Sequence, residues 1–145
     1  MGKKEIEVDI KVPNHTRYLS LIGRIGEDIA KEVDKYAGDR ETLAYHLNLV
    51  LTEAMVNAIK YASSKDPEKL VHILINISKH DLVIKVFDKG QGFNINSIPP
   101  PDFEKLEDRG RGIFLIRSLM DSVSYKKVKN GNVLEMSKKL HGTDS

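Results

Sequence analysis

The spacing of apolar residues changes between about two and about 3.6 along the chain, which predicts alternating strands and helices. Residues 5–12 alternate apolar and polar side chains, as a strand with one buried face does. From about residue 18 to residue 37 the apolar positions recur every three or four residues, which predicts an amphipathic helix. Gly38 and Asp39 indicate its C-cap and the N-cap of a second helix, expected to reach about Ala62.

The next segment predicts a hairpin followed by an irregular stretch. Residues 70–78 and 81–87 are rich in Val, Ile and Phe, and Lys79–His80 lies between them. This pattern favours two strands joined by a tight turn. Residues 94–109 contain "IPPP", which excludes regular structure because proline and the residue before it avoid helical and central-strand conformations.

The C-terminal part predicts one more helix and one more hairpin. Residues 112–123 form an apolar helical pattern, and "KNGN" lies between the strand-like segments 123–128 and 133–140. Asn-Gly is a strong hairpin signal. The order β-α-α-β-β-loop-α-β-β predicts an α/β two-layer sandwich, in which helices pack on one face of a mixed, mainly antiparallel sheet.

Composition adds mainly exclusions to this picture. At 145 residues the chain is expected to form a single domain spanning residues 1–145, and the absence of Cys excludes disulfides and thiolate metal sites. The apolar runs are too short to cross a bilayer, and the N-terminus lacks a signal-peptide core. A net charge of +2 with 30% charged residues does not indicate nucleic-acid binding. We therefore expect a cytoplasmic protein without a membrane segment.

The second predicted helix is apolar on most of its sides but carries a few polar residues among them. On a helical wheel of "LVLTEAMVNAIKYA" and the turn before it, His46, Glu53, Asn57 and Lys60 fall within one narrow arc. The arc is either a solvated stripe or a polar seam that faces a ligand. In the second case, an amide oxygen and a carboxylate one turn apart suit a metal–phosphate group.

Two glycine-rich segments add candidate chemistry. In "VFDKGQGF", Asp88 ends a strand, and Gly90 and Gly92 would let the backbone approach a ligand closely; an ordinary turn between strands would look similar. An Asp at that point could accept a hydrogen bond from an exocyclic amine.

The second glycine-rich segment is "DRGRGIFLIRSLMD". Gly110 and Gly112 stand directly before an apolar helix, and Arg109 and Arg111 add positive charge. Free backbone N–H groups at a helix start form a phosphate site. A flexible loop that ends at a helix is the simpler alternative.

The three segments in this order resemble the GHKL ATPase and kinase superfamily, whose layered structure is the Bergerat fold. "EAMVNAIKYA" looks like its N box, "DKGQG" like its first glycine box and "GRGIFLIRSLMD" like its second, with the interval matching the ATP lid. The chain is most similar to the bacterial anti-sigma-factor serine kinases, over essentially its whole length. Nothing resembles a Walker-type P-loop.

The resemblance implies an ATP site with Mg²⁺. Asn57 would ligate the magnesium, Glu53 would be the general base for the attacking hydroxyl, and Asp88 would accept the adenine amine. Residues passing or wrapping the nucleotide would be Gly90, Gly92, Gly110 and Gly112, with phosphate contacts or charge from Lys60, Arg109 and Arg111.

Two parts of the family pattern stay open. Many members carry a Thr near the C-terminus that supports the adenine pocket, whereas Glu135 and Ser137 stand in "VLEMSKKL", so that contact is unassigned. The lid is short and rich in proline, which leaves its closure over ATP open.

The resemblance also implies the function. It implies an ATP-dependent serine/threonine kinase that phosphorylates an anti-anti-sigma protein with a STAS domain, binds a sigma factor and pairs as a homodimer. The alternatives are a non-catalytic ATP-sensing module and a histidine-kinase catalytic domain. The intact Glu53 argues against the sensor. None of the five His residues has the setting of a phosphoacceptor on a dimerising helix, which argues against the histidine kinase.

Overall fold

The structure is a computed structural model that describes residues 5–33, 36–60, 70–89, 111–129 and 131–140. Its elements follow the predicted order, with a short 3-10 helix, η1, added before the first α-helix. They are β1 (Ile6–Pro13), η1 (Thr16–Tyr18), α1 (Leu19–Glu32), α2 (Arg40–Lys60), β2 (Leu70–Ile77), β3 (Asp81–Asp88), α3 (Arg111–Leu119), β4 (Ser122–Val128) and β5 (Gly131–Lys139). The predicted irregular stretch 94–109 lies outside the described residues.

The strands form a five-stranded sheet in the order β1-β2-β3-β5-β4. We expected a mixed, mainly antiparallel sheet. Among the described residues every neighbouring pair of strands is antiparallel, so the sheet contains no parallel pair there. The tight β2–β3 and β4–β5 hairpins account for two of these pairs, because a connection of two or so residues joins only antiparallel strands. The predicted two-layer α/β arrangement is confirmed.

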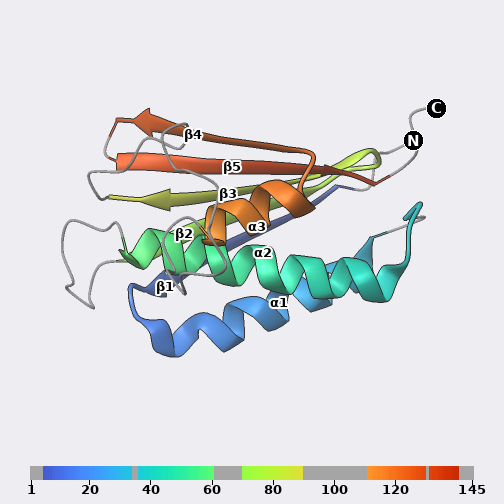
Figure 1. The fold of residues 1–145 in the computed structure, drawn as a ribbon, viewed down its shortest axis with the longest axis horizontal. Helices are drawn as coiled ribbons and strands as arrows, with labels where there is room; N and C mark the ends of the chain where they lie inside the picture. Colours follow the sequence, from blue (N-terminus) through green and yellow to red (C-terminus); the bar gives the residue numbers. More distant parts are fainter. Residues whose placement is uncertain (1–4, 34–35, 61–69, 90–110, 130, 141–145) are drawn as a thin grey trace.

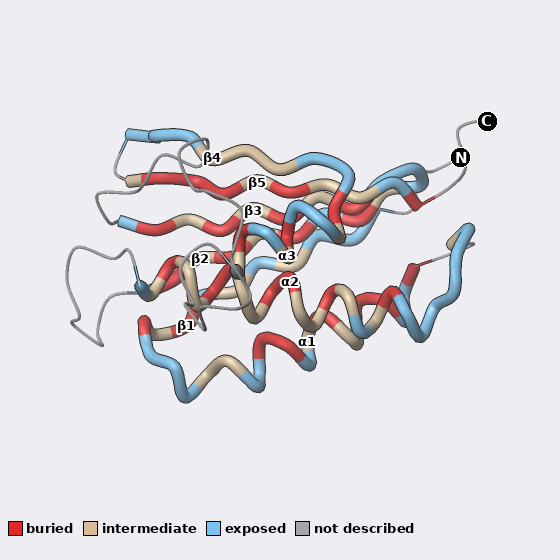
Figure 2. Tube along the Cα trace, viewed as in Figure 1, coloured by how far each residue is buried: buried red, intermediate tan, exposed pale blue. Residues whose placement is uncertain are grey.

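All three α-helices cover the same face of the sheet (Figure 1). Burial alternates along β3: Leu82, Ile84 and Val86 are buried beneath the helices, while Val83 and Lys85 lie on the uncovered face. Helix α2 lies between α1 and α3 and contacts both, and its apolar residues fill the space above the strands. Figure 2 shows the burial concentrated between α2 and the central strands, whereas edge strand β4 and the outer side of α1 are largely exposed.

The boundary between the first two helices differs from the prediction. Asp39 is the N-cap of α2, as expected: its carboxylate accepts from the Thr42 N–H at 3.0 Å. However, α1 ends at Glu32, so Gly38 is not its C-cap. The guanidinium of Arg40 donates to the carbonyls of Ala30 at 2.8 Å and Val33 at 2.5 Å, which closes the end of α1 with a side chain from the next helix.

The third helix is also shorter than predicted. It ends at Leu119 rather than Val123, because Ser122 and Val123 pair with β5 as the first residues of β4. The Asp121 N–H donates to the Ser137 carbonyl at 2.9 Å, so the change from helix to strand takes place within two residues. The predicted β4–β5 hairpin is confirmed, with Val128 paired to Gly131.

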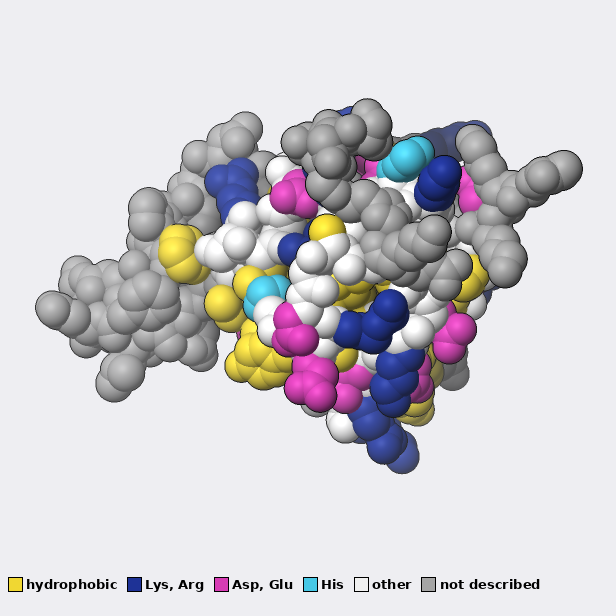
Figure 3. Space-filling view, turned by 90° about the vertical axis from the view of Figure 1, so that its right-hand side faces the viewer, with side chains coloured by type: hydrophobic (Ala, Val, Ile, Leu, Met, Phe, Trp, Pro, Cys, Tyr) yellow, Lys and Arg dark blue, Asp and Glu magenta, His cyan; other side chains and the backbone are white. Residues whose placement is uncertain are grey.

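The surface carries charges of both signs. On the face drawn in Figure 3, a run of basic side chains lies next to a group of acidic ones. Among the described residues, no helix combines the length and the apolar character that a bilayer crossing requires.

Candidate functional site

Helix α2 presents a polar seam near its C-terminal end. Glu53, Asn57 and Lys60 follow one another at helical spacing; the first two are half-buried and Lys60 is exposed. On the sides of the helix next to them, Ala54 and Ala58 are buried in the core. The apolar packing on either side therefore fixes which way the polar residues face.

The first turn of α3 lies against this seam. A side-chain Cβ at Gly112 would stand 3.0 Å from Oε2 and 3.6 Å from Cβ of Glu53. At Glu53 the seam therefore faces another helix and not open solvent. The alternative that these polar residues are only a solvent-exposed stripe on α2 does not hold at this position. The first backbone N–H groups of a helix have no partner within that helix and carry partial positive charge. The carboxylate of Glu53 thus lies beside the positively polarised start of α3. We call Glu53, Asn57, Lys60 and Gly112 the helix seam.

A second group of polar residues lies at the end of β3. Asp88 is buried, with 7% of its surface exposed. Its Oδ1 accepts from Nδ2 of Asn132 at 3.0 Å, and its Oδ2 accepts from the hydroxyl of Tyr125 at 3.1 Å. We call these three residues the sheet cluster.

Strand register brings the sheet cluster together. Asp88 is the direct partner of Asn132 on β5, while Tyr125 on β4 pairs with Leu134 and reaches Asp88 diagonally. Gly131 allows the close approach: its φ is +154°, and a Cβ there would lie 2.0 Å from the Asp88 carbonyl oxygen. Any other residue at position 131 would push β5 away from the end of β3.

Sequence reasoning missed Tyr125 and Asn132. The two residues it weighed instead face the uncovered side of the sheet: Glu135 pairs with Lys85, and the Ser137 hydroxyl shares a 2.5 Å hydrogen bond with Ser122. The available signal was the alternation along β5. Asn132 shares its parity with the buried Leu134 and Met136, so its side chain points to the helix side of the sheet.

The helix seam and the sheet cluster lie at the same end of the molecule. The C-terminal ends of α2 and β3 lie on the left in Figure 1, and the first turn of α3 is the end of that helix nearer to them. The helix seam joins residues of α2 and α3, the sheet cluster joins residues of β3, β4 and β5, and both lie toward the same end of the helix–sheet layer. Of the other predicted site residues, Gly90, Gly92, Arg109 and Gly110 lie outside the described residues. Arg111 begins α3, and its side chain lies outside the description.

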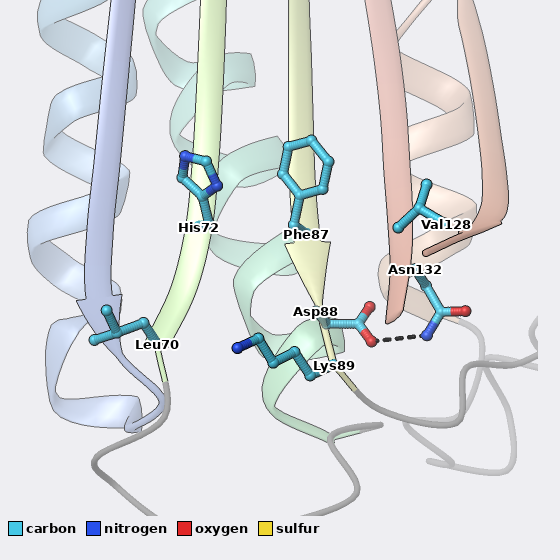
Figure 4. Close-up of a pocket in the computed structure, with 7 residues that line it drawn as sticks. All are labelled: Leu70, His72, Phe87, Asp88, Lys89, Val128 and Asn132. Atoms are coloured by element: carbon cyan, nitrogen blue, oxygen red, sulfur yellow. Dashed lines mark hydrogen bonds between the residues drawn. The ribbon is translucent and has the colours of Figure 1, made fainter. Parts of the chain in front are cut away.

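A small hollow lies at the same end of the sheet but on its other face. It has a volume of about 190 Å³ and is bordered by the sheet cluster residues Asp88 and Asn132 together with His72 and Phe87. The rings of His72 and Phe87 stack 5.2 Å apart and rise from the uncovered face (Figure 4). Ligand pockets usually measure about 300–1,000 Å³. The hollow is therefore too small for a nucleotide, and it lies away from the helix seam.

The oxygen donors of the helix seam suit a metal ion that takes few of its ligands from the protein. The described residues contain no group of three or more His, Cys, Asp or Glu side chains placed to hold a metal ion. Mg²⁺ is usually held by one or two protein oxygens together with substrate phosphates and water. The amide oxygen of Asn57, one turn from Glu53, can supply such a ligand.

His46, in the same arc of α2, belongs to a different environment. Partial burial, and secondarily the positive charge of Lys138, lower the pKa of His46 below its usual 6.5. His46 lies two helical turns before Glu53, about 10 Å along the axis. The charge that acts on it is that of Lys138 on β5, and we do not count it in the helix seam.

The chain is similar to several known proteins. A family model described as a histidine kinase-like ATPase domain matches residues 14–138. The serine-protein kinases RsbW of Staphylococcus aureus strains bovine RF122 / ET3-1 and JH9 are each 29% identical over 147 residues, covering 95% of this chain and 89% of theirs. A histidine kinase domain from the Erythrobacter litoralis EL346 blue-light activated histidine kinase is 18% identical, with a TM-score of 0.47. That likeness covers 88% of this chain and 61% of the solved chain.

Proposed function

This chain belongs to the histidine kinase-like ATPase domain family, and we propose that it is an ATP-dependent serine/threonine protein kinase of the anti-sigma-factor type. The observation that carries the proposal is the position of Glu53 against the first turn of α3. In a fold of this family, that arrangement puts a carboxylate beside donors suited to phosphate. The Staphylococcus aureus relatives, named serine-protein kinases, support the choice of a hydroxyl as acceptor.

In the proposed reaction, Glu53 acts as the general base. It accepts the proton of the serine or threonine hydroxyl while that oxygen forms a bond to the γ-phosphorus of ATP. The bond between the γ-phosphorus and the β–γ bridging oxygen breaks, and ADP leaves with the electron pair. Gly112 lets α3 approach Glu53 closely, and the base and the N–H groups of the first turn would then face the same phosphate.

The remaining residues would bind the nucleotide. Asn57 would hold Mg²⁺, which neutralises charge on the β- and γ-phosphate oxygens when it is bound. Asp88 would accept the exocyclic amine of adenine. Side chains or backbone around the phosphates would come from Lys60, Gly90, Gly92, Arg109, Gly110, Arg111 and Gly112.

The proposed substrate is a serine on a STAS-domain anti-anti-sigma protein, and the proposed second partner is a sigma factor. Both are implied by the resemblance of the sequence to the anti-sigma-factor kinases, and the similarity to the RsbW serine-protein kinases, which spans nearly the whole chain, supports them. A homodimer is part of the same proposal. A competing assignment as a non-catalytic ATP sensor would require the base to be dispensable, and the placement of Glu53 argues against that.

The test is phosphotransfer from γ-labelled ATP, with this protein alone and with a purified STAS-domain protein. We expect no label on this chain when it is alone, and an acid-stable phosphoserine or phosphothreonine on the partner. Acid-labile label on this chain would indicate phosphohistidine and contradict the serine-kinase assignment. ATP binding without transfer to any of a set of STAS partners would favour the sensor.

A further inference from the structure

The two oxygens of Asp88 are held from two different strands. Asn132 of β5 donates to Oδ1, and Tyr125 of β4 donates to Oδ2 (the first of these bonds is drawn in Figure 4). The torsion that turns an aspartate carboxylate about its Cβ–Cγ bond is intrinsically broad. A single donor would restrain this rotation only weakly. Donors on both oxygens, anchored on separate strands, fix the plane of the carboxylate.

A fixed carboxylate discriminates between purines. An ionised carboxylate accepts hydrogen bonds and donates none. Adenine carries an amine donor at the position where guanine carries a carbonyl acceptor, so a well-oriented carboxylate attracts the first and repels the second. Hydrogen-bond strength falls steeply as the angle at the donor departs from linear. Orientation of the Asp88 carboxylate therefore affects discrimination as well as affinity.

We propose that Tyr125 and Asn132 are positioning residues that orient the Asp88 carboxylate, so that the preference for an adenine nucleotide depends on the whole sheet cluster. This inference rests on the proposed function, because it assumes that Asp88 faces the base of ATP. Tyr125 acts through Asp88 and not by touching the reacting phosphate. Its position on an edge strand makes its hydroxyl removable without opening the core: the side chain is only partly buried.

The central experiment removes one hydroxyl. Tyr125→Phe is compared with the wild type and with Tyr45→Phe, a matched control at a largely exposed position of α2. Affinities are measured for ATP, for GTP and for purine riboside triphosphate, which has the ATP skeleton without the exocyclic amine. We expect Tyr125→Phe to weaken ATP binding by about 3–10-fold, the range of one modest hydrogen bond. Binding of the amine-free nucleotide should not change, and the ATP-to-GTP preference should fall by a similar factor.

A second pair of variants tests the other donor with shape held constant. Asn132→Thr keeps a short hydroxyl donor, whereas Asn132→Val has nearly the same volume and no donor. We expect the Thr variant to discriminate ATP from GTP more strongly than the Val variant. Melting temperatures of both confirm that folding is retained. This pair tests whether donors orient the Asp88 carboxylate even if Tyr125→Phe does not fold.

The outcomes separate the two proposals. Wild-type protein that binds no ATP overturns the proposed function together with this inference. Wild-type protein that prefers ATP, with Tyr125→Phe weakening ATP and the amine-free nucleotide equally, overturns only the inference, because the hydroxyl would then support the fold and not the amine contact. If the Thr and Val variants at position 132 discriminate ATP from GTP equally, Asn132 does not orient the Asp88 carboxylate, and the inference is overturned for that residue.

Discussion

The helix seam and the sheet cluster lie at the same end of the molecule but are built in opposite ways. In the helix seam, side chains one turn apart share a face, and the essential feature is the missing side chain at Gly112. In the sheet cluster, a buried carboxylate is held by donors from two other parts of the chain. The helix seam depends on residue spacing along α2 and on the missing side chain at Gly112. The sheet cluster depends on strand register and hydrogen bonds.

This difference suggests a division of labour. A carboxylate that must accept a proton during phosphotransfer needs room and a nearby phosphate. A carboxylate that must recognise a base needs a fixed orientation. We therefore expect changes at Glu53 and Gly112 of the helix seam to lower mainly the transfer rate, and changes in the sheet cluster to lower nucleotide affinity and selectivity.

The largest expected effect is that of Glu53→Gln. The substitution keeps the shape of the side chain and removes its ability to accept a proton. The transfer rate should fall by about 10²–10⁴-fold, the usual contribution of a general base, while ATP affinity stays within a few-fold. Single-turnover assays and calorimetry on the same preparation measure both. An unchanged transfer rate would make Glu53 a structural residue.

The second effect is that of Gly112→Ala. The added Cβ would stand 3.0 Å from Oε2 of Glu53, so the carboxylate must move or α3 must shift. A displacement of about 1 Å in a catalytic group can cost roughly 10²-fold in rate. The rate should fall by about that factor with a smaller loss of ATP affinity. Ser118→Ala, on the exposed side of α3, is the control for a small change in the same helix.

The third effect belongs to the sheet cluster. Asp88→Asn keeps the size of the side chain but replaces one carboxylate oxygen, an acceptor, with an amide group that donates. ATP affinity should fall by about 10–150-fold, the value of a hydrogen bond to a charged group. GTP should then compete better relative to ATP than it does against the wild type. If GTP already competes as well as ATP against the wild type, Asp88 does not recognise the base.

The smallest effect concerns His46, which lies on the same helix but outside both regions. Its pKa is lower in the folded protein than the usual 6.5, so the unfolded chain binds a proton more readily. Stability should therefore fall as the pH drops through the range just below 6.5, and level off below the folded pKa. His46→Gln should remove this part of the pH dependence in urea unfolding without changing ATP affinity. A steeper pH dependence in the variant would contradict the assignment.

The same contrast explains what the sequence could predict. The shared helix face of Glu53 and Asn57 could be predicted because residues four apart lie on one side of a helix, and the position of Asp88 at a strand end could be predicted because glycines follow it. The alternation along β5 indicates only which side of the sheet Asn132 faces; the contacts of Tyr125 and Asn132 with Asp88 depend on the register of β3, β5 and β4, which the sequence alone does not give. The end of α1 was misplaced for a related reason: Arg40, a residue of the following helix, closes it.

The most direct test of this division is the dependence of the single-turnover transfer rate on ATP concentration in Asp88→Asn and Glu53→Gln. We predict that Asp88→Asn raises the ATP concentration for half-maximal rate while its plateau rate stays within a few-fold of the wild type. Glu53→Gln should lower the plateau by about 10²–10⁴-fold with little change in the half-maximal concentration. A plateau for Asp88→Asn that falls as far as that of Glu53→Gln would contradict the separation of recognition from chemistry.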